Sequence, residues 1–146
     1  MQPLADITDV AHAIQLAVAP VFLLTAVGAF LTVMTNRLGR LIDRARLLEG
    51  KLEAAGPQAV PLLKENLKVL SKRARYINIA ITACVITALL VCAVIAILFF
   101  GSYANLDTRT AVPLIFIFAM LSLMIGLLCF LQEVFLASLN LRIGPK

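Results

Sequence analysis

The sequence predicts an all-α membrane protein with three transmembrane helices and a cytoplasmic antiparallel helical hairpin formed by extensions of the first two. The first observation is composition: 62% of the 146 residues are hydrophobic and only 14% are charged, whereas soluble domains carry about 25% charged residues. The second is that three stretches each hold roughly 20 predominantly apolar residues, enough to cross a hydrocarbon core of about 30 Å. The third is that 14 of the 21 charged residues lie between Arg37 and Arg75. An ordinary water-soluble globule is therefore excluded.

The three apolar stretches set the predicted boundaries within a single membrane domain. The spans are residues 14–36, 76–100 and 111–139. The remaining segments are an outer tail or interfacial helix at 1–13, the hairpin at 37–75, an outer loop at 101–110 and a tail at 140–146.

The distribution of Lys and Arg predicts the orientation of these spans. Ten of the thirteen basic residues lie in 37–75, and basic connections are retained on the cytoplasmic side. The N-terminal tail has none, and the second connection has only Arg109, balanced by Asp107. We therefore expect the N-terminus outside and the C-terminus in the cytoplasm. Topology then explains the net charge of +5, and no nucleic-acid partner is expected because acidic residues interrupt the basic segment.

Apolar residues recur at helical spacing on both sides of a break within 37–75. Gly56, Pro57 and Pro61 predict the break, because proline lacks an amide donor and restricts the residue before it. The two apolar runs are Leu38, Leu41, Ala45, Leu48 and Leu52, then Leu63, Leu67, Leu70, Ala74 and Ile77. In the resulting hairpin, the two apolar runs either pack against each other or offer a coiled-coil-like surface for self-assembly or for a cytoplasmic partner.

A basic face on the returning helix leads to the predicted membrane boundary. It consists of Lys64, Lys68, Lys72 and Arg75. These charges can attract anionic lipid headgroups. A solvated positive face predicts the same stripe, so both interpretations stay open.

Each predicted span carries its polar or small residues mainly on one face, which favours contact with protein or water at that face. The stripe of the second span contains Asn78, Thr82, Cys92 and Ala96, with Thr87 as the exception, and that of the third contains Ser122, Gly126, Cys129, Glu133 and Asn140. The stripe of the first span contains Thr25, Gly28, Thr32, Thr35 and Asn36. This last stripe either packs helices closely or lines a water-filled path in a homo-oligomer, because three helices cannot enclose a path alone.

Glu133 is the only carboxylate within a predicted span, and it lies near the cytoplasmic boundary. Arginines at the ends of the neighbouring helices reach the same level, and an unpaired buried carboxylate would be costly. We therefore expect Glu133 to form interfacial ion pairs. The arginines at this level are Arg37, Arg40, Arg73 and Arg75. The candidate partners among them are Arg37, Arg40 and Arg75. A gate or a proton-linked site is the alternative role.

Pro20 interrupts the hydrogen bonding of the first span. We expect it to kink the span, or to divide an outer amphipathic piece from the membrane helix. Whether the segment before Pro20 is a separate interfacial helix stays open.

The run APVFLLTAVGAFLTVMTNRLGRLIDRAR at 19–46 resembles the bacterial membrane-protein family catalogued as domain of unknown function 2721. The matching positions are Ala19, Pro20, Val21, Thr25, Gly28, Arg37, Asp43, Arg44 and Arg46, and LQEVFLA with Glu133 also resembles the family pattern. The resemblance implies a bacterial cytoplasmic membrane and no assigned activity. Within this pattern Asp43 can pair with Arg46 at i, i+3 or with an arginine of the returning helix, and either pair would fix the register of the hairpin.

These observations predict a non-enzymatic, homo-oligomeric scaffold that presents the cytoplasmic hairpin to a partner. The alternative is a small oligomeric ion or solute channel lined by the stripe of the first span. The sequence has no phosphate-binding GxxxxGK[ST] loop, GxSxG turn, HExxH motif or paired cysteines. No catalytic residue, metal site or cofactor is therefore predicted.

Overall fold

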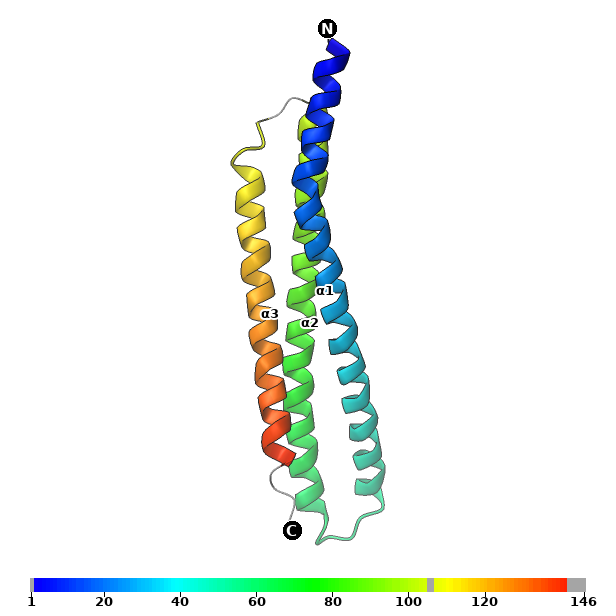
Figure 1. Ribbon diagram of the computed structural model, residues 1–146. Helices are drawn as coiled ribbons and strands as arrows, with labels where there is room; N and C mark the ends of the chain where they lie inside the picture. The colour runs from blue at the N-terminus through cyan, green and yellow to red at the C-terminus, as the bar shows by residue number, and fades with distance from the viewer. Residues whose placement is uncertain (1, 105–106, 142–146) are drawn as a thin grey trace. The chain divides into compact units, whose positions relative to one another are not determined.

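The computed structural model describes residues 2–104 and 107–141, with side chains at 7–104 and 107–139. The described residues form three α-helices: α1 (Gln2–Glu53), α2 (Val60–Ala104) and α3 (Ala111–Leu141) (Figure 1). Each is long and apolar enough to cross a membrane, within Ile7–Glu53, Val60–Ala104 and Ala111–Leu139. The predicted all-α class and the three candidate spans are confirmed, and the chain is a multi-pass membrane protein by these criteria.

Helix α1 is continuous from the predicted outer tail through the first span and into the charged segment. Pro20 lies inside α1 and is buried, and the helix does not end there. Of the two outcomes expected at Pro20, a division into two separate helices is therefore not seen, and the kink stays a prediction. Proline removes one backbone hydrogen bond of α1. The helix tolerates this loss because packing around the buried Pro20 holds the backbone in place.

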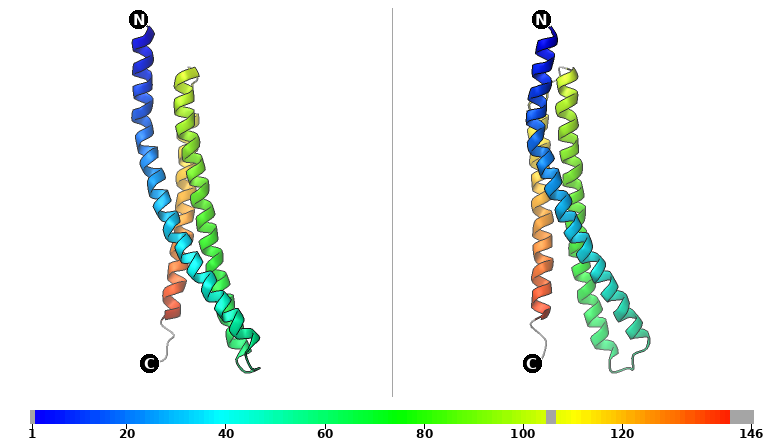
Figure 2. Two further views of the ribbon diagram at one scale, coloured as in Figure 1. Left: turned by 90° about the vertical axis from the view of Figure 1, so that its right-hand side faces the viewer. Right: turned by 45° about the vertical axis from the view of Figure 1, so that its right-hand side comes forward.

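A short connection, residues 54–59, joins α1 to α2 (Figure 2). The amide of Ala55 donates to the Leu52 carbonyl at 3.4 Å, and that of Ala59 donates to the Gly56 carbonyl at 3.0 Å. The break falls at Gly56 and Pro57, as predicted, but Pro61 belongs to the first turn of α2. Proline is compatible with that position, because the first amides of a helix have no intrahelical acceptor.

The chain divides into two compact units, each taking part of every helix. The first unit is Met1–Phe30 with Ala83–Met124, and the second is Leu31–Thr82 with Ile125–Lys146.

The core of the first unit is built largely from small side chains. Ala119 of α3 is fully buried, as are Cys84 and Thr87 of α2. Small residues let helix backbones approach closely, which is how helices pack where lipid removes the hydrophobic driving force between them. The other buried Ala, Val and Leu residues of this unit are Ala13, Ala17, Val27, Ala83, Val91, Val94 and Leu123.

The core of the second unit contains larger apolar side chains and one charged residue. Met34, Ile77 and Ala80 are fully buried. Leu41 and Leu70, one from each predicted apolar run of the charged segment, are 6% and 7% exposed. The buried members of this unit also include Glu133, which is fully shielded from solvent.

Two hydroxyls link α2 to α3 inside the first unit. The Thr87 hydroxyl lies 2.9 Å from the Ala83 carbonyl and 3.2 Å from the Ala119 carbonyl of the facing helix. Ser122 donates to the Ala83 carbonyl at 2.9 Å. The polar atoms of this contact are therefore satisfied within the chain.

Replacing Thr87 with valine should weaken the α2–α3 contact without changing its volume. Interhelical hydrogen bonds in membranes contribute about 0.6 kcal/mol on average and at most about 1.7. We expect a loss of about 1 kcal/mol in the free energy of unfolding, measured by detergent-induced denaturation. Thr82→Val is the matched control, because the Thr82 hydroxyl is exposed and donates only to Asn78 of its own helix. Equal effects of the two changes would contradict this account.

Candidate functional site

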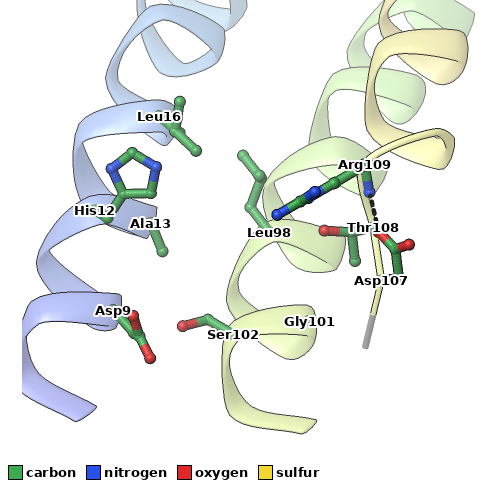
Figure 3. Close-up of a pocket in the computed structure, with 10 residues that line it drawn as sticks. All are labelled: Asp9, His12, Ala13, Leu16, Leu98, Gly101, Ser102, Asp107, Thr108 and Arg109. Atoms are coloured by element: carbon green, nitrogen blue, oxygen red, sulfur yellow. Dashed lines mark hydrogen bonds between the residues drawn. The ribbon is translucent and has the colours of Figure 1, made fainter. Parts of the chain in front are cut away.

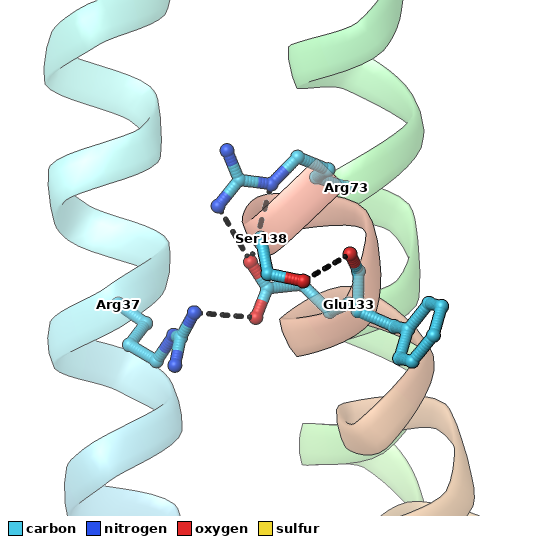
Figure 4. Close-up of polar contacts among 5 residues, drawn as sticks. Arg37, Arg73, Glu133 and Ser138 are labelled. Atoms are coloured by element: carbon cyan, nitrogen blue, oxygen red, sulfur yellow. Dashed lines mark hydrogen bonds and ion pairs between the residues drawn. The ribbon is translucent and has the colours of Figure 1, made fainter. Parts of the chain in front are cut away.

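Glu133 is the centre of a charged cluster in the second unit. Its side chain is fully buried, and arginines from the two other helices reach it (Figure 4). Arg73 of α2 donates twice to Oε1, from Nη2 at 2.8 Å and from Nε at 3.2 Å. Arg37 of α1 places Nη2 3.0 Å from Oε2. One carboxylate therefore ties all three helices together.

The two arginines are held differently. Arg73 forms a pair of charge-assisted hydrogen bonds, the stronger kind of contact. Arg37 is close enough to Oε2 for an ion pair, but no hydrogen bond to Oε2 is formed with suitable alignment. The Arg37 guanidinium also lies 5.4 Å from the centre of the Phe130 ring, within range of a cation–π contact. Arg37 is thus the less firmly fixed partner.

The second arginine of the cluster is Arg73 rather than the predicted Arg40 or Arg75. Arg75 is exposed, because two residues on a helix are separated by about 200° and only Arg73 faces α3. Arg40 is exposed and forms no ion pair among the described residues, although it lies beside the cluster. The sequence pattern placed all four arginines at one level but did not distinguish their faces.

A cavity of about 570 Å³ adjoins the cluster within the second unit. Four arginines line it, and Glu133 is the only acidic residue among its lining residues. The basic lining residues are Arg37, Arg40, Arg44 and Arg73. The cavity therefore has a formal charge of +3, which favours an anionic ligand.

The three predicted polar stripes differ in how they are used. The stripe of α3 turns inward: Gly126 and Glu133 are buried and Ser122 is hydrogen-bonded to α2, whereas Asn140 lies outside the described side chains. The stripe of α2 turns outward, and its exception, Thr87, is the buried residue. The exposed residues of the α2 stripe are Asn78, Thr82, Cys92 and Ala96.

The stripe of α1 is exposed throughout. It contains Thr25, Gly28, Thr32, Thr35 and Asn36. Thr25 donates to the Val21 carbonyl at 3.2 Å, and Thr35 donates to the Leu31 carbonyl at 2.7 Å. A Cβ added at Gly28 would meet nothing within 4 Å, so the backbone is open to close approach there. All five positions are therefore accessible at the surface of the single chain.

The predicted register contacts of the hairpin are not formed. Asp43, Arg44 and Arg46 are exposed, and Asp43 has no ion-pair partner within 4.0 Å among the described residues. An exposed i, i+3 pair contributes only a few tenths of a kcal/mol, which the entropy of two mobile side chains can offset. The face formed by Lys64, Lys68, Lys72 and Arg75 is exposed as well, and its contact with anionic lipid stays a prediction.

A family model described as "Protein of unknown function (DUF2721)" matches residues 17–143. The chain belongs to the DUF2721 family. The family resemblance seen in the sequence is thereby confirmed over most of the chain. The matched region includes the stripe of α1 and all members of the Glu133 cluster. The curated proteins and the solved structures gave no match.

A second cavity of this DUF2721 protein lies in the first unit and has about 560 Å³ (Figure 3). Asp9 and His12 line it from α1, Ser102 from α2, and Arg109 from the residues preceding α3. A Cβ at Gly101 would overlap the side chain of Thr108, so glycine permits this close approach. Asp9 and His12 precede the matched region, so the family model covers this cavity only in part.

The described side chains do not form a metal centre. Within 7–104 and 107–139, no group of three or more His, Cys, Asp and Glu residues could hold a metal ion. All three cysteines are free: Cys84 is buried, Cys129 is half-buried and Cys92 is exposed. Among the described residues, the Glu133 cluster contains both ion pairs, and its cavity is lined by four arginines.

Proposed function

We propose that this DUF2721 protein is a non-enzymatic homo-oligomeric scaffold of the bacterial cytoplasmic membrane. Its charged segment, 37–75, forms a cytoplasmic helical hairpin that presents a surface to a partner. The observation that carries the proposal is the stripe of α1, whose five residues are all exposed in the single chain.

The chemistry of the stripe supports contact with another helix. Gly28 and Thr32 are four residues apart, the spacing at which small residues bring membrane helices into close contact. The open backbone at Gly28 supplies the space for a neighbouring chain. Asn36 is exposed beside them and forms no side-chain hydrogen bond to the described residues, so an amide donor and acceptor are available to a second subunit.

The charged segment supports the scaffold role through its apolar surface. Ile42, Leu47 and Leu62 are 41%, 59% and 64% exposed, although they lie outside the predicted spans. Exposed large apolar side chains in water favour association with another protein surface. Their flanking charges would keep the hairpin out of the bilayer.

Disulfide crosslinking in native membranes tests the proposed oligomer. Thr32→Cys, in a background without the three native cysteines, should form dimers because Thr32 lies on the stripe. Val33→Cys is the matched control: Val33 is 50% exposed and has nearly the same depth, but lies about 100° away around α1. We expect at least a severalfold higher dimer yield at position 32. Equal yields, or monomers only with intact protein present, would refute the proposal.

An oligomeric channel is the alternative, and it uses the same stripe. In the single chain the hydroxyls of Thr25 and Thr35 already donate to backbone carbonyls, which fits close helix packing better than a hydrated wall. Ion flux through reconstituted liposomes distinguishes the two. A scaffold predicts no flux above that of empty liposomes, whereas a channel predicts flux that Thr32→Trp blocks.

A further inference from the structure

The arginine cavity of the second unit has a charge excess that the packing of the chain does not require. Two of its arginines, Arg37 and Arg73, share the Glu133 carboxylate. The other two, Arg40 and Arg44, are exposed and have no ion-pair partner among the described residues. Four guanidinium groups around one carboxylate repel one another, so a bound anion would lower the energy of the cavity.

The donors of the cavity match a phosphate group. Arginine presents planar N–H pairs that fit two phosphate oxygens at once, which lysine cannot do. Asn66 of α2 adds a neutral amide to the lining. The volume of about 570 Å³ lies within the range of about 300–1,000 Å³ found for small-molecule sites.

The position of the cavity favours a membrane lipid as the source of that phosphate. Arg37 is the first charged residue after the apolar span of α1, so it lies where the hydrocarbon region ends. The cavity also has apolar walls, formed by Leu41, Leu48, Val69, Leu70 and Ala137. A basic pocket between helices at the membrane surface is the arrangement that binds anionic headgroups.

We propose that the cavity lined by Arg37, Arg40, Arg44 and Arg73 is a binding site for a phosphate-bearing anion, with an anionic phospholipid headgroup as its occupant. The site is separate from the exposed lysine face of α2. Its lining residues come from a single chain, so the test of this site is separate from the test of the oligomer. Glu133 positions two of the arginines and lowers the net charge, so that the unliganded site remains stable.

The test is native mass spectrometry of the full-length protein in detergent, titrated with phosphatidylglycerol and, separately, with phosphatidylcholine. The variant is Arg40→Gln with Arg44→Gln, which removes two cavity charges and leaves the Glu133 ion pairs in place. The matched control is Arg46→Gln with Lys51→Gln, which removes two exposed charges of α1 that do not line the cavity. Circular dichroism of both variants verifies that they remain folded.

The expected result is saturable binding of phosphatidylglycerol to the unaltered protein, with weak binding of phosphatidylcholine. The cavity variant should lose about 25-fold in affinity, since each basic residue near an anionic headgroup contributes about a factor of five. The control variant should change by less than twofold. Equal losses in the two variants would mean diffuse surface attraction and would overturn the site, as would an absence of saturable binding.

A competition arm identifies the source of the phosphate. Millimolar inorganic phosphate should not displace phosphatidylglycerol, because the lipid also contacts the apolar walls. If inorganic phosphate displaces the lipid completely from the unaltered protein but not from the cavity variant, the cavity is a phosphate site whose occupant is a soluble anion. Displacement that is the same in both variants would refute the cavity as the site.

Discussion

Replacing Arg73 with alanine is expected to destabilise the protein by about 3 kcal/mol, because it leaves a fully buried carboxylate with one partner. The remaining partner, Arg37, forms an ion pair but no aligned hydrogen bond to Oε2. Arg73→Lys should lose less, since it keeps the charge but not the two donors that reach Oε1. Detergent-induced unfolding, followed by circular dichroism, measures the free energy of unfolding of each variant.

Arg75→Ala is the matched control for this prediction. Arg75 has the same charge and lies two residues away, but it is exposed and does not contact Glu133. We expect it to change the free energy of unfolding by no more than about 0.5 kcal/mol. A similar loss in both variants would show that basic charge in general, rather than the buried pair, stabilises the fold.

A double-mutant cycle with Glu133→Gln isolates the interaction. Once the carboxylate is neutral, removal of Arg73 no longer leaves a buried charge unpaired. The double variant should therefore be more stable than the sum of the single effects predicts, by roughly 1–3 kcal/mol. Strict additivity would contradict the proposed cluster.

The second large effect is expected at Ala119, where leucine should destabilise the contact of α2 with α3 by about 2–3 kcal/mol. Ala119 is fully buried, and its carbonyl accepts a hydrogen bond from Thr87 across the interface. Three added carbons cannot fit without moving α3 away from α2, which costs packing and the hydrogen bond together. The same unfolding measurement gives the loss.

Ala96→Leu provides the control for overpacking. Ala96 lies in the span of α2 but is exposed, so a larger apolar side chain there meets lipid rather than protein. We expect no measurable change in stability. If Ala119→Leu were equally tolerated, the close approach of the two helices in the first unit would be wrong.

For the Glu133 cluster, residue types alone predicted that the carboxylate is paired, but not which arginines pair with it. The presence of Glu133 in an apolar stretch was enough to predict a paired carboxylate, because a buried charge without a partner is costly. The identity of one partner was not predictable, since Arg73 and Arg75 differ by two residues and their faces are set by the rotation of α2 against α3. Arg73 was visible in the sequence as one of four arginines at that level, but no periodic signal singled it out.

For the polar stripes, too, the sequence predicted their existence but not their surroundings. Helical spacing located one stripe on each span, but it did not reveal that the α3 stripe turns inward while those of α1 and α2 remain exposed. The continuity of α1 through Pro20 was also beyond local rules, because packing of the neighbouring backbone can outweigh one missing hydrogen bond. The expected ion pairs of Asp43 are not formed among the described residues, because an exposed ion pair is too weak to hold two side chains in one geometry.

By itself, the sequence determined that the chain consists of three long apolar helices with a charged segment between the first two, because hydrophobicity and periodicity depend only on the order of residues. The tertiary structure alone decided which polar faces meet inside the chain, which arginines share Glu133, and that four arginines surround one cavity. These features depend on the rotation of each helix about its axis. That rotation is fixed by contacts between side chains far apart in the sequence, where small residues such as Ala80 and Ala119 allow close approach and a single buried carboxylate requires its partners.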